Sequence, residues 1–251
     1  MGQQDGILQL KGNVGKFNFF KREGEYMART KAGVSKSKIM NDPAFARTRE
    51  NMAEFGRAGK AGKLLRSSLN ALLVNCKDSS RVGRLTAAFR KVVKADSTNV
   101  RGMRNVLDGE TELLTGFQMN QNSALTSTIF APFATTIDRV TGELVVNIPA
   151  FVPLHMITAP QGTTHFQINS AGVSVDFENE LYDVDVQRSA SIAWDSVATA
   201  PIALTNAVPA NSTHPLFLVV GIEFYQETNG ALYPLKNGAF NSLAIVKVAG
   251  V

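Results

Sequence analysis

Hydrophobic and polar residues alternate along the C-terminal half of the chain, from Asp108 onward, with the two-residue period of β-strands. Turn residues separate the alternating segments, and Thr141-Gly142 and Asn229-Gly230 are typical of tight hairpins. Short strands joined by proline-rich connections favour an antiparallel β-sandwich. The expected strands cover residues 126–130, 133–138, 144–148, 164–168, 173–177, 181–194, 216–226, 231–235 and 240–248.

A helical period replaces this alternation in the middle of the chain. Asp42 followed by Pro43 predicts a helix start, because a carboxylate accepts hydrogen bonds from free N–H groups and proline fits the first turn. This helix should extend to residue 73. Apolar residues at helical spacing over 82–93 predict a second, amphipathic helix that forms a helical hairpin with the first. A third short helix is expected over 98–107.

Residues 7–31 contain short alternating segments separated by glycines, and they predict a β-hairpin. An isolated hairpin is only marginally stable in water, so this arm should dock on the chain's own sheet or on a neighbouring subunit. Its candidate anchors are Phe17, Phe19 and Tyr26. Residues 30–41, with scattered lysines, glycine and serines, are expected to form a linker.

Together these patterns predict an α+β fold in three parts. Residues 1–36 form the β-hairpin arm and its linker, residues 37–109 a basic helical region, and residues 110–251 an antiparallel β-sandwich. A chain of 251 residues is long enough to bury a sizeable core as one large or two smaller domains.

Residues 56–64 repeat a glycine, a basic residue and an apolar residue three times within the first helix. Each glycine in a helix interior costs about 1 kcal/mol relative to alanine, so either the helix breaks or another backbone lies on the glycines. The pattern has two open interpretations: a kinked or closely packed helix with solvated basic side chains, or a surface that docks an anion, nucleic acid or a subunit. The candidate close-packing strip is Gly56, Gly59 and Gly62, and the candidate docking residues beside it are Arg57, Lys60, Lys63 and Arg66.

This glycine-rich segment does not fit a phosphate-binding P-loop. That motif needs G-x-x-x-x-G-K-[ST] between a strand and a helix. Counting back from Gly62-Lys63 places Arg57 at the first glycine and Leu64 at the hydroxyl position. The segment also follows a helix, so the sequence argues against a nucleotide-binding loop.

The net charge of +5 hides an uneven distribution of charge between the two halves of the chain. Residues 1–104 carry 22 Lys and Arg against 8 Asp and Glu, a net +14, whereas residues 105–251 carry 4 against 13, a net −9. Such asymmetry suggests a charged partner, either nucleic acid or another copy of the chain. The alternative is that the two halves face each other within one molecule.

No chemical activity is evident in the sequence. His155, His165 and His214 are too scattered for a metal site or catalytic triad, and His155 is expected to be packed in an apolar stretch. The single Cys76 lacks a nucleophile context. The sequence therefore predicts neither an enzyme nor a cofactor or metal site.

An acidic cluster is the other feature with possible chemistry. Asp183 and Asp185 should point the same way from a strand, the pattern of a half-exposed sheet face. A calcium site and a docking surface for the basic half are the alternatives, although EF-hand spacing is absent. The cluster comprises Asp176, Glu178, Glu180, Asp183 and Asp185.

The N-terminus lacks a basic segment followed by an apolar stretch, and no run of apolar residues approaches the length of a membrane span. The expectation is a protein without membrane attachment, made in the cytoplasm or released in an assembled particle without a signal peptide. The single cysteine agrees with a reducing compartment.

The segment over residues 11–66 resembles a family of uncharacterised proteins encoded in Bacteroidota genomes. It carries KGNVGKFNFFKREGEYMARTKAGV followed by NDPAFARTRENMAEFGRAGKAGKLLR. The resemblance implies a glycine-punctuated hairpin, an Asn-Asp-Pro helix and a β-rich C-terminal half. It implies no activity.

Three functional hypotheses follow, in order of preference. The first is a non-enzymatic structural protein that assembles into a homo-oligomer, filament or phage-like shell through its arm and its oppositely charged halves. The second is a nucleic-acid-associated module that places the basic helical residues on phosphates. The third is an enzyme whose site the sequence does not reveal.

Overall fold

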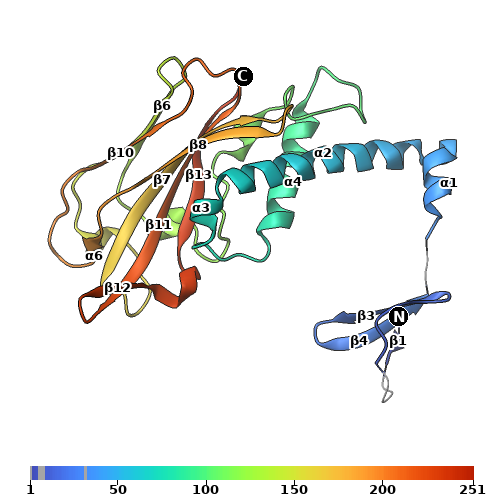
Figure 1. Ribbon diagram of the computed structural model, residues 1–251, viewed down its shortest axis with the longest axis horizontal. Coiled ribbons are helices and arrows are strands. Elements are labelled where there is room, and N and C mark those ends of the chain that lie inside the picture. The colour runs from blue at the N-terminus through green and yellow to red at the C-terminus, as the bar shows by residue number, and fades with distance from the viewer. Residues whose placement is uncertain (1, 5–8, 31–32) are drawn as a thin grey trace. The chain divides into compact units, whose positions relative to one another are not determined.

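The computed structural model shown in Figure 1 describes residues 2–4, 9–30 and 33–251, and of Lys236 and Asn237 the backbone only. It divides the chain into two units, residues 1–49 and 50–251. The fold class is α+β, as the sequence predicts.

The N-terminal unit contains a four-stranded antiparallel sheet with the order β1-β4-β3-β2. The predicted hairpin is β3 and β4, whose turn places Glu23 and Gly24 at positive φ. Two further strands make the sheet larger than predicted, while residues 7, 8 and 31 of the predicted arm lie outside the described residues. The strands are β1 (Gly2–Gln3), β2 (Gly12–Val14), β3 (Phe17–Arg22) and β4 (Glu25–Thr30).

The segment expected to be a linker instead contains helix α1 (Lys36–Asn41). Ser35 caps this helix, because its Oγ accepts a hydrogen bond from the Lys38 N–H at 3.2 Å. The helix start at Asp42 is confirmed: its Oδ1 accepts from the Ala44 N–H at 2.9 Å, and the 3₁₀ turn η1 (Pro43–Phe45) leads into α2 (Ala46–Ser68).

In the second unit, α2, α3 (Asn70–Leu73) and α4 (Arg81–Ala95) lie against one face of a large antiparallel sheet (Figure 1). Leu65 of α2 and Phe89 of α4 are fully buried in this core against sheet residues such as Phe217. Both predicted helices are therefore present and cover one face of the sheet. The first does not continue to residue 73 as predicted: it ends at Ser68, and residues 70–73 form the separate helix α3.

The large sheet has the order β12-β11-β7-β8, with β13 also paired to β11 and β9 also paired to β7. A smaller sheet, β10-β6-β5, packs on its other face, and side chains such as Leu144, Ile168 and Val220 fill the space between them. The strands are β5 (Ala134–Asp138), β6 (Glu143–Ile148), β7 (His165–Asp176), β8 (Leu181–Arg188), β9 (Ile192–Ala193), β10 (Ile202–Ala207), β11 (Leu216–Thr228), β12 (Ala231–Pro234) and β13 (Ser242–Ala249).

The strand predicted over 181–194 is divided into β8 and β9. Two other predicted elements are absent. Residues 98–107 form turns, because the buried Asp96 carboxylate accepts the N–H groups of Thr98, Asn99 and Asn105 and holds this segment as a loop. Residues 126–130 belong mostly to a short helix in which the Thr128 hydroxyl donates back to the Ala124 carbonyl at 2.8 Å. The remaining short helices are η2 (Thr111–Leu114), α5 (Leu125–Thr128), α6 (Pro153–Met156) and η3 (Leu235–Gly238).

Candidate functional site

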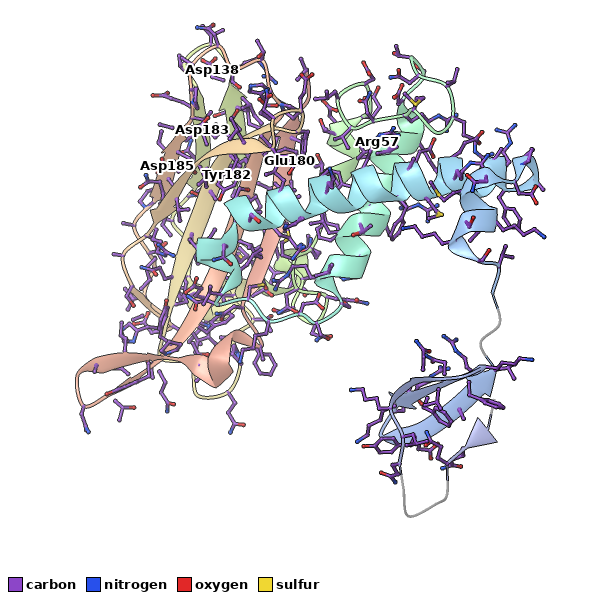
Figure 2. All side chains as sticks on the ribbon, turned by 45° about the vertical axis from the view of Figure 1, so that its right-hand side comes forward. Arg57, Asp138, Glu180, Tyr182, Asp183 and Asp185 are labelled. Atoms are coloured by element: carbon purple, nitrogen blue, oxygen red, sulfur yellow. The ribbon has the colours of Figure 1, made fainter. Side chains whose placement is uncertain are left out.

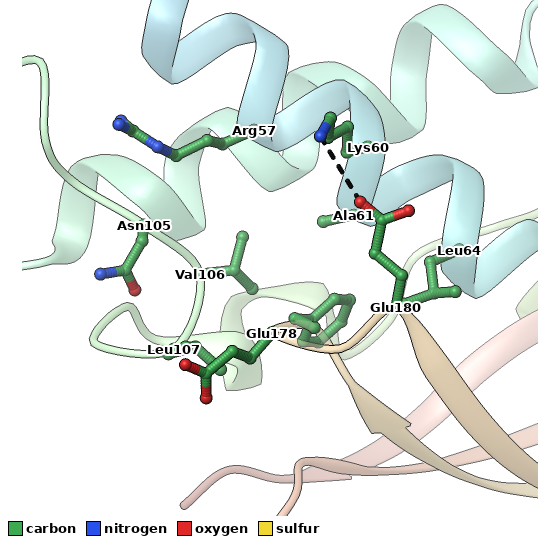
Figure 3. Close-up of a pocket in the computed structure, with 10 residues that line it drawn as sticks. Arg57, Lys60, Ala61, Leu64, Asn105, Val106, Leu107, Glu178 and Glu180 are labelled. Carbon is green, nitrogen blue, oxygen red and sulfur yellow. Dashed lines mark hydrogen bonds and ion pairs between the residues drawn. The ribbon is translucent and has the colours of Figure 1, made fainter.

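A cleft of about 220 Å³ opens between α2, the loop at residues 105–107 and the turn from β7 to β8 (Figure 3). Its lining includes the apolar side chains of Leu64, Val106 and Phe177. Pockets that hold cofactors or drug-sized ligands span roughly 300–1,000 Å³. The cleft is therefore smaller than a typical cofactor or ligand pocket.

The predicted basic residues do not form one common surface. Arg57 binds within the chain, since its Nη1 donates to the carbonyls of Gly102 at 2.8 Å and Arg104 at 2.9 Å. Lys60 reaches across the cleft to Glu180 at 3.5 Å, an ion pair whose side chains are 75% and 61% exposed (Figure 3). Lys63 is exposed, and Arg66 lines a different hollow beside α4.

The glycines do not break α2. A Cβ at Gly62 would meet Phe89 at 3.5 Å, which is ordinary van der Waals contact, and at Gly56 and Gly59 it would meet no atom within 4 Å. Among the described residues, no second backbone lies on this strip. The free energy lost at the glycines is offset by the burial of neighbouring Ala58, Ala61 and Leu65.

The acidic cluster is divided among separate local roles. Asp176 closes the β7–β8 turn, and the hydrogen bond from the Asn179 side chain is the main reason that its pKa is lowered. Asp185 connects the two sheets by accepting the Ala207 N–H at 2.8 Å. Within the part of the chain that the structure describes, no three His, Cys, Asp or Glu side chains are grouped to hold a metal ion.

Strand β8 forms an edge of the large sheet (Figure 2). Its register with β7 pairs Tyr182 with Val175 and Val184 with Val173, so both side chains lie on the face covered by the helices. Tyr182 is nevertheless 42% exposed and Val184 39% exposed. The edge thus presents apolar side chains to solvent beside Asp183.

The three predicted arm anchors lie on one face of the N-terminal sheet. The register of β3 and β4 pairs Phe19 with Ala28 and Lys21 with Tyr26, and Phe17 points the same way as Phe19. The two phenyl rings are 6.3 Å apart between centroids. None of the described residues of this unit is buried, and Phe17 is 49% exposed.

The cysteine and the histidines add no reactive group to these surfaces. Burial raises the pKa of the Cys76 thiol to about 11, although Arg81 opposes the shift. His155 is exposed, so the prediction that it is packed is wrong, because its short helix turns the ring toward solvent. His165 and His214 each lie 3.7 Å from a carboxylate oxygen.

Sequence reasoning missed the apolar lining of the cleft. Val106 and Phe177 lie far apart in the chain and meet only through packing of the loop against the β7–β8 turn. Phe177 lies within the acidic cluster, between Asp176 and Glu178, and the alternation predicts it only as the end of the strand 173–177. Its ring packs edge-on against Phe89 at 5.7 Å between centroids.

Comparisons with protein-family models, curated proteins and solved structures gave no match. The resemblance to a Bacteroidota family stays a prediction. Within the described ranges, no helix combines the length and hydrophobicity needed to cross a bilayer.

Proposed function

We propose that this chain is a non-enzymatic structural subunit that assembles with copies of itself through its N-terminal sheet. One observation carries the proposal: a four-stranded sheet gathers Phe17, Phe19 and Tyr26 on one face, yet none of its described residues is buried. A sheet with an apolar face needs another layer to cover it. A second protein surface supplies that layer.

Charge supports another copy of the chain as the source of that surface. Residues 1–49 carry ten Lys and Arg against four Asp and Glu, a net +6, whereas residues 105–251 carry a net −9. Opposite charges on two regions of one chain favour association between copies and steer their encounter.

Nucleic-acid binding has less support. Arg57 is engaged by loop carbonyls and Lys60 by Glu180, which leaves Lys63 and Arg66 to meet phosphates. Two phosphate contacts give weak binding with a shallow salt dependence. Assembly into a homo-oligomer, filament or shell accounts for both the exposed aromatic face and the uneven charge, whereas nucleic-acid binding accounts for the charge alone.

Light scattering of the intact chain at low and physiological salt tests the proposal. We expect a mass of several copies for the native chain and a monomer for Phe17→Ser. Phe130→Ser is the matched control, because Phe130 is 55% exposed on the other unit, and it should assemble like the native chain. A native chain that is monomeric at both salt concentrations contradicts the proposal.

A further inference from the structure

The edge of strand β8 has main-chain groups available for a further strand. All of its ladder partners belong to β7. The Asn206 side chain of β10 donates to the Asp185 carbonyl at 2.9 Å, but among the described residues no second strand pairs with residues 181–184. The exposed stretch contains no lysine or proline, and Asp183 is its one charged residue, so a strand that brings positive charge meets no like-charged guard there.

The N-terminal sheet has a complementary edge. Strand β2 is the last strand in its order and pairs only with β3 among the described residues. Exposed Lys11 precedes β2 and exposed Lys16 follows it, whereas exposed Glu180 precedes β8 and exposed Asp183 lies within it. Glu180 also forms the ion pair with Lys60, but an exposed pair of this kind is weak and can exchange its lysine for one of another copy. The two unpaired edges therefore carry opposite charge.

The side chains beside the two edges also match. Val14 of β2 pairs with Phe17, so it continues the apolar face of the N-terminal sheet and is 56% exposed. Tyr182 and Val184 are the exposed apolar side chains of β8. If β2 pairs with β8 in the register that places Val14, Tyr182 and Val184 on the same face, the apolar surfaces of the two sheets become continuous.

We infer that strand β2 of one copy adds to strand β8 of another copy, and that this contact is the assembly contact of the proposed function, on which the inference rests. Main-chain hydrogen bonds supply the attachment, and the lysines and carboxylates select the partner. Nucleic acid does not fit here, because the carboxylates repel phosphate.

Paired charge reversals in the intact chain test this contact. Lys11→Glu with Lys16→Glu should abolish assembly, and Glu180→Lys with Asp183→Lys should do the same, both measured by sedimentation at low salt. The chain that carries all four substitutions again has opposite charges on its two edges. Its assemblies should therefore have the same mass as those of the native chain. Loss in both double variants with recovery in the fourfold variant supports the inference.

A matched control reverses carboxylates away from β8. Glu143→Lys with Glu227→Lys changes the net charge equally and should leave assembly intact, and it should not rescue the lysine reversals. If the native chain assembles and the β8 reversal assembles equally well, β8 is not the acceptor, while the proposed function stands. If the fourfold variant stays monomeric, charge pairing between these edges is overturned. A monomeric native chain overturns both proposals.

Discussion

The two units of this chain differ in how far they bury their hydrophobic residues. The sandwich of residues 50–251 has cores on both faces of its large sheet, and Phe89, Phe166 and Phe217 are fully buried there. The N-terminal unit exposes its aromatic residues to different degrees and buries none of those described. One unit has its own buried core, whereas the other leaves its described aromatic residues at least partly exposed.

Because of this contrast, aromatic residues should have different roles in the two units. An aromatic ring inside the sandwich stabilises the fold, because its removal leaves a cavity. An aromatic ring on the N-terminal sheet should leave the sandwich unchanged and affect association instead. The following predictions separate these two roles, from the largest expected effect to the smallest.

Phe217→Ala should destabilise the sandwich by about 3–5 kcal/mol, because it removes a fully buried ring packed against Phe177. Phe17→Ala should leave the denaturation midpoint unchanged at a dilution where the chain is monomeric. Urea unfolding followed by tryptophan fluorescence measures both, since Trp194 lies in the sandwich. Equal losses from the two substitutions would contradict the contrast between the units.

Acid should weaken the sandwich through Asp96. Burial opposes ionisation of this carboxyl, but hydrogen bonds from the Asn99 and Asn105 N–H groups outweigh it and lower its pKa. A lowered pKa in the folded state stabilises the fold above the unfolded value, about 3.9, and this contribution is lost as the pH falls through the folded pKa. Asp96→Asn should therefore cost stability at pH 7, and this cost should decrease as the pH falls below about 4. A pH-independent cost would show that hydrogen-bond geometry alone is responsible.

Gly59→Ala should stabilise the sandwich by about 1 kcal/mol, because the position is inside α2 and a Cβ there meets no atom within 4 Å. Thermal unfolding measures the gain, and assembly should be unaffected. Gly83→Ala in α4 is the matched control, since it also faces open space. Loss of assembly in the Gly59 variant alone would show that another copy's backbone lies on the glycine strip.

Lys60→Gln with Lys63→Gln should produce the smallest change. Both side chains are exposed, and an exposed ion pair contributes little to stability, so the unfolding midpoint should stay within error. Retention of DNA or RNA in a mobility-shift assay at physiological salt provides the second measurement. Binding by the native chain that is lost in this variant would favour the nucleic-acid alternative over assembly.

The sequence predicts the elements whose pattern is local. The period-two segments give β5 and β6, and the amphipathic spacing gives α4, since each pattern reports a single half-buried face. Strands β11 and β13 were also predicted, although both of their faces are largely buried. Asn229-Gly230 predicts the turn between β11 and β12, where both residues have positive φ.

Elements that depend on distant partners were missed or misassigned. Strand β10 has a weak apolar pattern, because its Asn206 is fully buried and is satisfied by Ser170 of β7 at 2.7 Å. The long β7 was predicted as two strands, since its polar centre looks like a turn until Asn169 meets buried Glu223. The cleft and the β8 edge likewise follow from packing. The alternation does place Phe17, Phe19 and Tyr26 on one face, and their role as arm anchors stays a prediction.

Hydrogen exchange of the intact chain at two concentrations tests the central claim most directly. In the assembled protein, the amides of β3 and β4 should be protected; at a dilution where the chain is monomeric, they should exchange nearly as fast as in an unfolded chain, because their sheet then lacks a covering layer. The amides of β7 and β11 should stay protected at both concentrations. Equal protection of β3 and β4 in the monomer would contradict the account, since the N-terminal sheet would then be stable without a second copy.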